Sequence, residues 1–91
     1  MMDDDKLQTA INRGVQADAK LKDPFLNECF DAIKAALVDG WAESSLHMSS
    51  EREHLWQLYQ ATAMLKALLV KYVNDGKMAR VDLERLLNLK R

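Results

Sequence analysis

The stretch KDPFLNECFDAIKAALVDGW, residues 22–41, decides the fold class because it carries both a helix start and a helical apolar stripe. Asp23 is a candidate N-cap, and Pro24 stands at the first helical position, where its missing amide hydrogen costs nothing. Apolar residues then recur at steps of three and four, namely Phe25, Leu26, Cys29, Phe30, Ile33, Leu37 and Trp41. This period predicts an amphipathic helix over about residues 24–44.

Similar periods occur on both sides of this stretch. Residues Leu7, Ala10, Ile11, Val15 and Ala19 predict a helix over about 4–21, which Gly14 weakens. After a serine-rich link, Ser50 and Glu53 match an S-x-x-E capping box, and a broad apolar face predicts a third helix over about 51–75. Gly76 suits the left-handed position after a helix end, so a separate short helix is expected over about 79–90.

These segments predict an all-α single domain over residues 1–91, built on an antiparallel hairpin of two long helices with shorter N- and C-terminal helices. The composition agrees, since 48% of the residues are apolar and there are only three Gly and one Pro. The apolar faces of helices 24–44 and 51–75 exceed what one hairpin and two short helices cover. We therefore expect a homo-oligomeric bundle, at least a dimer.

Glu51 and His54 form one Glu-x-x-His pair, which is half of the ligand set of a carboxylate-bridged di-iron bundle. A homodimer would complete the set with Glu28 or Glu43 from each second helix. However, Glu51 and His54 fall in the first turn of their helix, where solvent competes. A capped, solvated helix start is therefore the preferred interpretation, and we expect no metal.

Other chemical signals are weak. Cys29 lies within the apolar stripe, far along the chain from both histidines, and is interpreted as a small core residue. The glycines are isolated and form no phosphate-binding loop. We accordingly expect no cofactor and no enzymatic activity.

Aromatic and basic residues supply the candidate binding surfaces. Trp41, Trp56, Tyr59 and Tyr72 are candidate interface anchors, although aromatic residues on an apolar stripe also suit a core. The C-terminal third is rich in bases, including Lys71, Lys77, Arg80 and Arg85. If these share one face they would contact phosphates or an acidic partner. Ordinary solvated helix faces are the preferred interpretation, so nucleic acid is not the favoured partner.

The expected compartment is a reducing cell interior. The single cysteine forms no internal disulfide, and the start MMDDDK lacks the apolar region of a secretory signal. The longest apolar run, MLKALLV, is too short to span a bilayer. These features predict a soluble protein without membrane contact.

Three segments, DPFLNECFDAIKAAL, SEREHLW and VNDGKMARVDLERL, together resemble a group of small helical proteins of tailed double-stranded DNA bacteriophages, over about residues 11–87. The likeness rests on Phe30 and Asp31 after Phe25 and Leu26, on Arg52, Glu53, Leu55 and Trp56, and on the turn Asp75, Gly76 and Lys77. In that group the genes tend to lie near head and packaging genes, and no catalytic or ligand set comes with the family.

The resemblance implies a non-enzymatic phage protein acting in virion structure or assembly, through self-association and contacts with other phage proteins. Its location would be the host cytoplasm or the virion. The alternative is a small phage-encoded inhibitor that binds a host or defence protein, or a nucleotide ligand, through its positive C-terminal portion.

Overall fold

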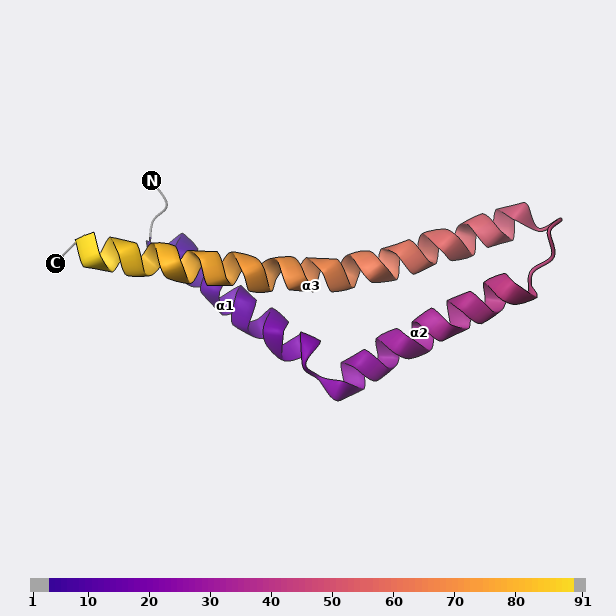
Figure 1. Cartoon of the computed structure of the whole chain (residues 1–91), viewed down its shortest axis with the longest axis horizontal. Helices are drawn as coiled ribbons and strands as arrows, with labels where there is room; N and C mark the ends of the chain where they lie inside the picture. The colour runs from indigo at the N-terminus through magenta and orange to yellow at the C-terminus, as the bar shows by residue number, and fades with distance from the viewer. Residues whose placement is uncertain (1–3, 90–91) are drawn as a thin grey trace. The chain divides into compact units, whose positions relative to one another are not determined.

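The computed structural model describes residues 4–89, and all regular structure in this range is helical. The helices are α1 (Asp4–Leu21), α2 (Pro24–Glu43) and α3 (Ser49–Leu89) (Figure 1). The all-α prediction is confirmed for this part of the chain. Lys90, where the predicted fourth helix ends, lies outside the described residues, as does Arg91. Within 4–89, no helix combines the length and the apolar character that crossing a bilayer requires.

Helix α2 begins as the sequence predicts. The Asp23 carboxylate accepts hydrogen bonds from the backbone amides of Phe25 at 2.9 Å and Leu26 at 3.2 Å, and Pro24 occupies the first helical position. At the other end, the Ser44 hydroxyl donates to the Trp41 carbonyl at 2.6 Å. The Asp23 side chain thus satisfies two amides that the helix start would leave unpaired, and the Ser44 hydroxyl adds a second bond to the Trp41 carbonyl, which also accepts from the Ser44 amide at 3.2 Å.

Helix α3 begins slightly earlier than predicted. The first intrahelical bond runs from the Arg52 amide to the Met48 carbonyl at 3.0 Å, which makes Met48 the N-cap. Ser50 therefore lies inside the first turn, and the predicted Ser50–Glu53 capping box is wrong. The cause is a preceding turn, closed by the Met48 amide on the Ser45 carbonyl at 3.0 Å, which brings the chain into helical geometry before Ser50.

Replacing Met48 with Asp is expected to stabilise the chain by about 1 kcal/mol, because methionine offers no oxygen to the free amides of the first turn and aspartate does. Urea unfolding followed by circular dichroism measures the change. Ser50→Ala serves as the control and is expected to alter the unfolding free energy little. If Ser50→Ala clearly lowers the unfolding free energy and Met48→Asp does not raise it, Ser50 is the N-cap of α3 after all.

Helix α3 runs without interruption through Gly76, so the predicted end near residue 75 and the separate helix over 79–90 are wrong. No residue in the described range, glycine included, has a positive φ. Lys71 and Asp75 form an ion pair at 3.1 Å along the helix, one turn before the expected break. Continuity brings Ala79, Leu83 and Leu86 to the apolar residues of α1, and this packing outweighs the glycine's poor helix propensity.

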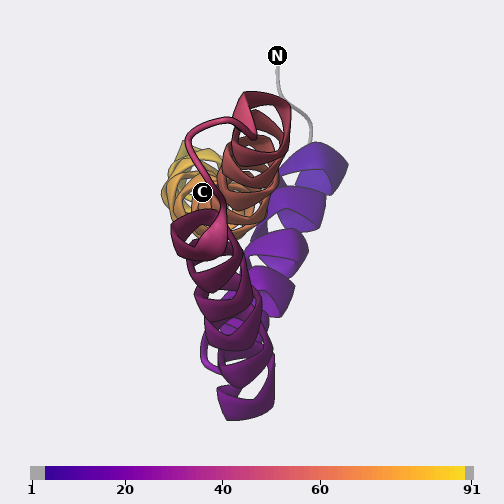
Figure 2. The same ribbon diagram turned by 90° about the vertical axis from the view of Figure 1, so that its right-hand side faces the viewer.

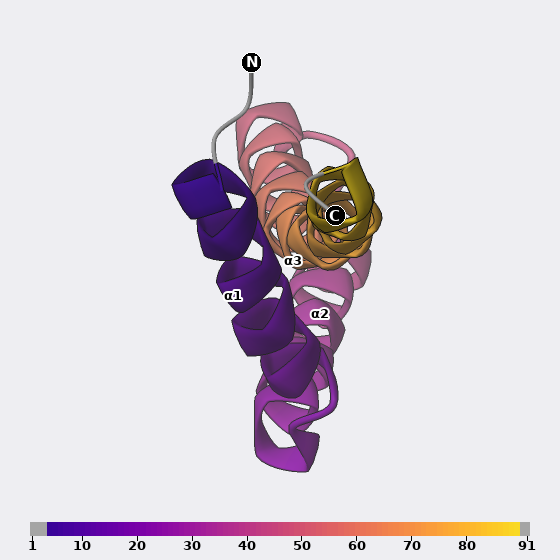
Figure 3. The ribbon, with the colours of Figure 1, turned by 90° about the vertical axis from the view of Figure 1, so that its left-hand side faces the viewer.

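The chain forms two compact units: a first unit of residues 1–22 and 67–91, and a second unit of residues 23–66. Helix α3 contributes to both. In the first unit, α1 packs on the C-terminal part of α3 (Figure 3). Its buried core is Leu7, Ile11 and Ala79, with Ala10, Leu83 and Leu86 packed against them.

The two helices of the first unit meet closely at a pair of glycines. A Cβ atom built on Gly14 would lie 3.0 Å from the Gly76 Cα and 3.0 Å from the Tyr72 carbonyl oxygen. A Cβ on Gly76 would lie 3.0 Å from the Gly14 Cα and 3.1 Å from the Ala10 carbonyl oxygen. Gly14, expected only to weaken its helix, is thus buried at a contact between two backbones.

The second unit pairs α2 with the first part of α3, joined by the loop over residues 44–48 (Figure 2). Three contacts along the pair join a cation to a ring: Trp41 with Arg52, Lys34 with Tyr59, and Phe30 with Lys66. Residue numbers fall along α2 as they rise along α3, so these two helices run antiparallel. Phe30 is the buried side chain of this unit, at 8% exposure.

Candidate interface groove

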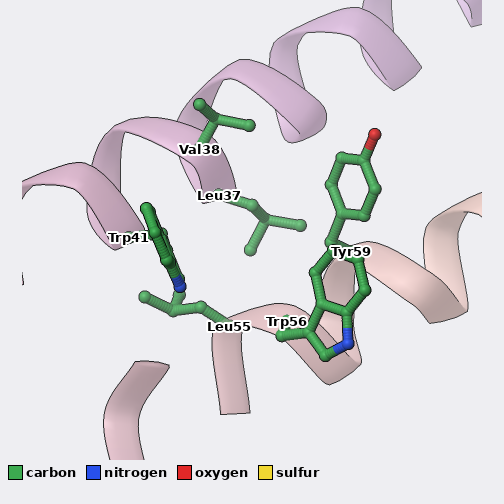
Figure 4. A pocket seen from close by; sticks show the side chains of 6 residues that line it. All are labelled: Leu37, Val38, Trp41, Leu55, Trp56 and Tyr59. Carbon is green, nitrogen blue, oxygen red and sulfur yellow. The ribbon is translucent and has the colours of Figure 1, made fainter. Parts of the chain in front are cut away.

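A groove lies between α2 and α3 in the second unit, with a volume of about 440 Å³ (Figure 4). We call it the aromatic groove, and the residues that line it are Leu37, Val38 and Trp41 of α2 and Leu55, Trp56 and Tyr59 of α3. The helical period explains the set. Residues at steps of three and four share a side of each helix, and the antiparallel pairing turns these sides toward each other.

The aromatic rings of the groove remain accessible. Trp56 stacks on Tyr59 with ring centroids 5.6 Å apart and planes inclined by 9°, as their three-residue spacing on one helix allows. Trp41 is 46% exposed and Trp56 is 50% exposed. Large aromatic faces that are only half covered give contact area at little cost in side-chain entropy, which suits the anchor positions of an interface.

Cationic side chains lie over the rings of this groove and over a further ring along the contact between α2 and α3. The Arg52 guanidinium lies 3.9 Å from the centroid of Trp41, and the Lys34 ammonium lies 5.9 Å from that of Tyr59. Further along, the Lys66 ammonium lies 5.6 Å from the centroid of Phe30. Each cation is attracted by the negative face of its ring. Among residues 4–89, none of these three cations makes an ion pair with a carboxylate.

Of the three cations, Arg52 is the one with a buried hydrogen-bond donor that lacks an acceptor among residues 4–89. Its Nε atom is buried and has no hydrogen-bond acceptor in the described structure. An unpaired buried donor costs about 1 to 3 kcal/mol. A guanidinium also carries two terminal nitrogens, and through these it binds a carboxylate in a two-bond geometry.

Of the four aromatic residues predicted as interface candidates, the structure brings three together. Trp41, Trp56 and Tyr59 all line the groove. Tyr72 belongs to the first unit, where its carbonyl oxygen faces Gly14. The sequence reasoning missed the roles of Arg52 and Lys34. A signal was present, because Arg52, Tyr59 and Lys66 are spaced by seven residues and therefore share one side of α3.

The four predicted basic residues, Lys71, Lys77, Arg80 and Arg85, do not gather on one face of α3. At 3.6 residues per turn, Lys71 and Arg85 share one side of the helix, while Lys77 and Arg80 lie on the other. Each side also carries acids: Asp75 pairs with Lys71, and Asp18 and Glu84 lie beside Lys77 and Arg80 around a second hollow. The first unit thus presents mixed charge on both sides of α3.

The residues of the di-iron hypothesis lie apart from the groove lining. Glu51 is exposed in the first turn of α3 and His54 in the second, and Glu28 and Glu43 are exposed on α2. No group of three or more metal-ligating side chains exists between residues 4 and 89. Cys29 is half-buried on α2 and lies outside the groove lining.

The chemistry of the aromatic groove is therefore that of a contact surface. Its lining offers apolar area and stacked rings. The cations beside these rings have no carboxylate partners in the described structure. Such a surface matches an apolar helix face that carries negative charge at its edges. Comparison of the chain with protein-family models, with curated proteins and with solved structures gives no match.

Proposed function

We propose that this chain is a non-enzymatic, self-associating helical protein that acts in the structure or assembly of a tailed-phage virion. The observation that supports self-association most directly is the half-exposed aromatic groove of the second unit. Soluble monomers rarely expose contiguous apolar patches of more than a few hundred Å². A second copy that covers the groove would remove this surface from water.

Other apolar side chains of the second unit add to the argument. Large exposed apolar residues on its helices outside the groove are Phe25, Ile33, Leu58, Met64 and Leu65, and the loop adds Leu46 and Met48. Two helices that bury Phe30 alone form a thin layer, and a thin layer gains stability by pairing with another. Antiparallel hairpins from two copies would give a bundle of four helices, which is a common way to bury such faces.

The virion role is supported by the resemblance of residues 11–87 to small helical proteins of tailed phages. Self-association suits that role, because virion parts are built from repeated copies. The alternative, an inhibitor that binds through a basic C-terminal surface, has less support. The four candidate bases, Lys71, Lys77, Arg80 and Arg85, lie on two sides of α3 and share both with acids.

Light scattering of the purified protein tests the self-association. At micromolar concentration we expect a mass of at least twice the 10.4 kDa of one chain. A mass near that of one chain would refute the proposal. Mass spectrometry of purified phage particles then tests the location, and absence from the particle would favour the inhibitor.

A further inference from the structure

The three bases of the second unit all lie over aromatic rings and none is paired with a carboxylate. Residues 23–66 contain seven acids, yet among them Lys34, Arg52 and Lys66 find no acid in the described structure. We call these three residues the cation row. Arg52 and Lys66 are fourteen positions apart on α3, a distance of about 21 Å at the rise of an α-helix.

Four of the seven acids, Glu28, Asp31, Asp39 and Glu43, lie exposed on α2. The side of α2 opposite to the buried Phe30 carries Glu28, Ala32, Ala35, Asp39 and Ala42, at steps of three and four residues, together with Glu43, one turn after Asp39. We call this the acidic face. Glu28 and Glu43 are about 22 Å apart along the helix, close to the span of the cation row.

We propose that the aromatic groove and the cation row of one copy take up the acidic face of α2 from a second copy. This inference rests on the proposed self-association and specifies which surfaces meet. The acidic face supplies carboxylates over the span of the row, including one for the guanidinium of Arg52. Its alanines carry only a methyl group, so the incoming helix approaches the rings closely.

The charges argue against a symmetric contact of groove with groove. That arrangement would bring two cation rows together, and like charges across an interface cost several kcal/mol. When the groove of one copy binds α2 of a second copy, the groove of the second copy stays free to bind a third. The contact is then heterologous, and it produces a ring or an extended chain of copies.

The test uses two charge-reversed variants. The row variant is Arg52→Glu with Lys66→Glu, and the face variant is Glu28→Lys with Asp39→Lys. Each variant alone is expected to associate at least tenfold more weakly than the wild type, because like charges then meet. All four residues are exposed or half-exposed, so both variants should retain helical circular dichroism.

Mixing the two variants gives the decisive measurement. Opposite charges meet again in the mixture, so association is expected to return, as seen by sedimentation or light scattering. A single chain carrying all four changes should also associate. Lys71→Glu with Arg85→Glu is the matched control: it changes the net charge as much as the row variant but should leave association unchanged.

The outcomes separate this inference from the proposed function. If the wild type associates and the row variant does so equally well, the inference is wrong. It is also wrong if both variants are weakened but their mixture stays monomeric, although self-association through the groove would then stand. A monomeric wild type would overturn the inference and the proposed function together.

Discussion

Gly76→Ala is expected to destabilise the chain by about 1 to 3 kcal/mol, the usual cost of forcing extra atoms into a packed contact. Helix propensity alone predicts the opposite, since alanine in a helix interior is favoured over glycine by about 1 kcal/mol. The close contact between α1 and α3 at Gly76 decides whether the substitution raises or lowers the stability of the chain. The new methyl group would lie 3.0 Å from the Gly14 Cα and 3.1 Å from the Ala10 carbonyl oxygen, and these are backbone atoms of a helix. Helix α1 would have to move away, and part of the core around Leu7 would open.

Gly40→Ala is the matched control because Gly40 also lies within a helix. A Cβ atom there would meet only the Leu55 side chain, at 3.6 Å, which is an ordinary van der Waals distance. This variant is expected to be more stable than the wild type by about 1 kcal/mol. Urea unfolding followed by circular dichroism measures both variants, and Gly14→Ala should behave like Gly76→Ala. Stabilisation by all three changes would show that α1 does not cross α3 at Gly14 and Gly76.

The parts of the fold that were predictable from the sequence are those set by nearby residues. The apolar period identifies α1 and α2 because it repeats within each helix. Asp23 and Pro24 fix the start of α2 by hydrogen bonds that reach only two or three residues ahead. Such local signals do not depend on the rest of the chain.

The continuity of α3 was not predictable in this way. A glycine after a long helix favours a left-handed end when nothing else contacts it. Gly76 instead faces Gly14, which lies far away in the sequence, and a local pattern does not reveal this contact. The same limit applies to the site. The sequence identified Trp41, Trp56 and Tyr59 as candidates, whereas the cation positions of Arg52 and Lys34 depend on the register between α2 and α3.

Trp56 is the residue at which the proposed association should be most sensitive to change. It stacks on Tyr59 inside the groove, and half of its surface remains exposed in one chain. Its apolar area is therefore available to a second copy. Because one chain covers only half of the side chain, truncation should cost the isolated chain less than truncation of a fully buried tryptophan.

Trp56→Ala is expected to weaken association by about 2 kcal/mol or more, the range of an interface hot spot. That corresponds to about a 30-fold rise in the dissociation constant, while far-ultraviolet circular dichroism stays helical. Sedimentation over a range of concentrations measures the constant. Met78→Ala is the control, since Met78 lies on α3 in the first unit, outside the groove, and is 67% exposed. If Trp56→Ala instead unfolds the single chain at a cost of about 3 to 5 kcal/mol, the tryptophan serves the core of the second unit and the groove is not the interface.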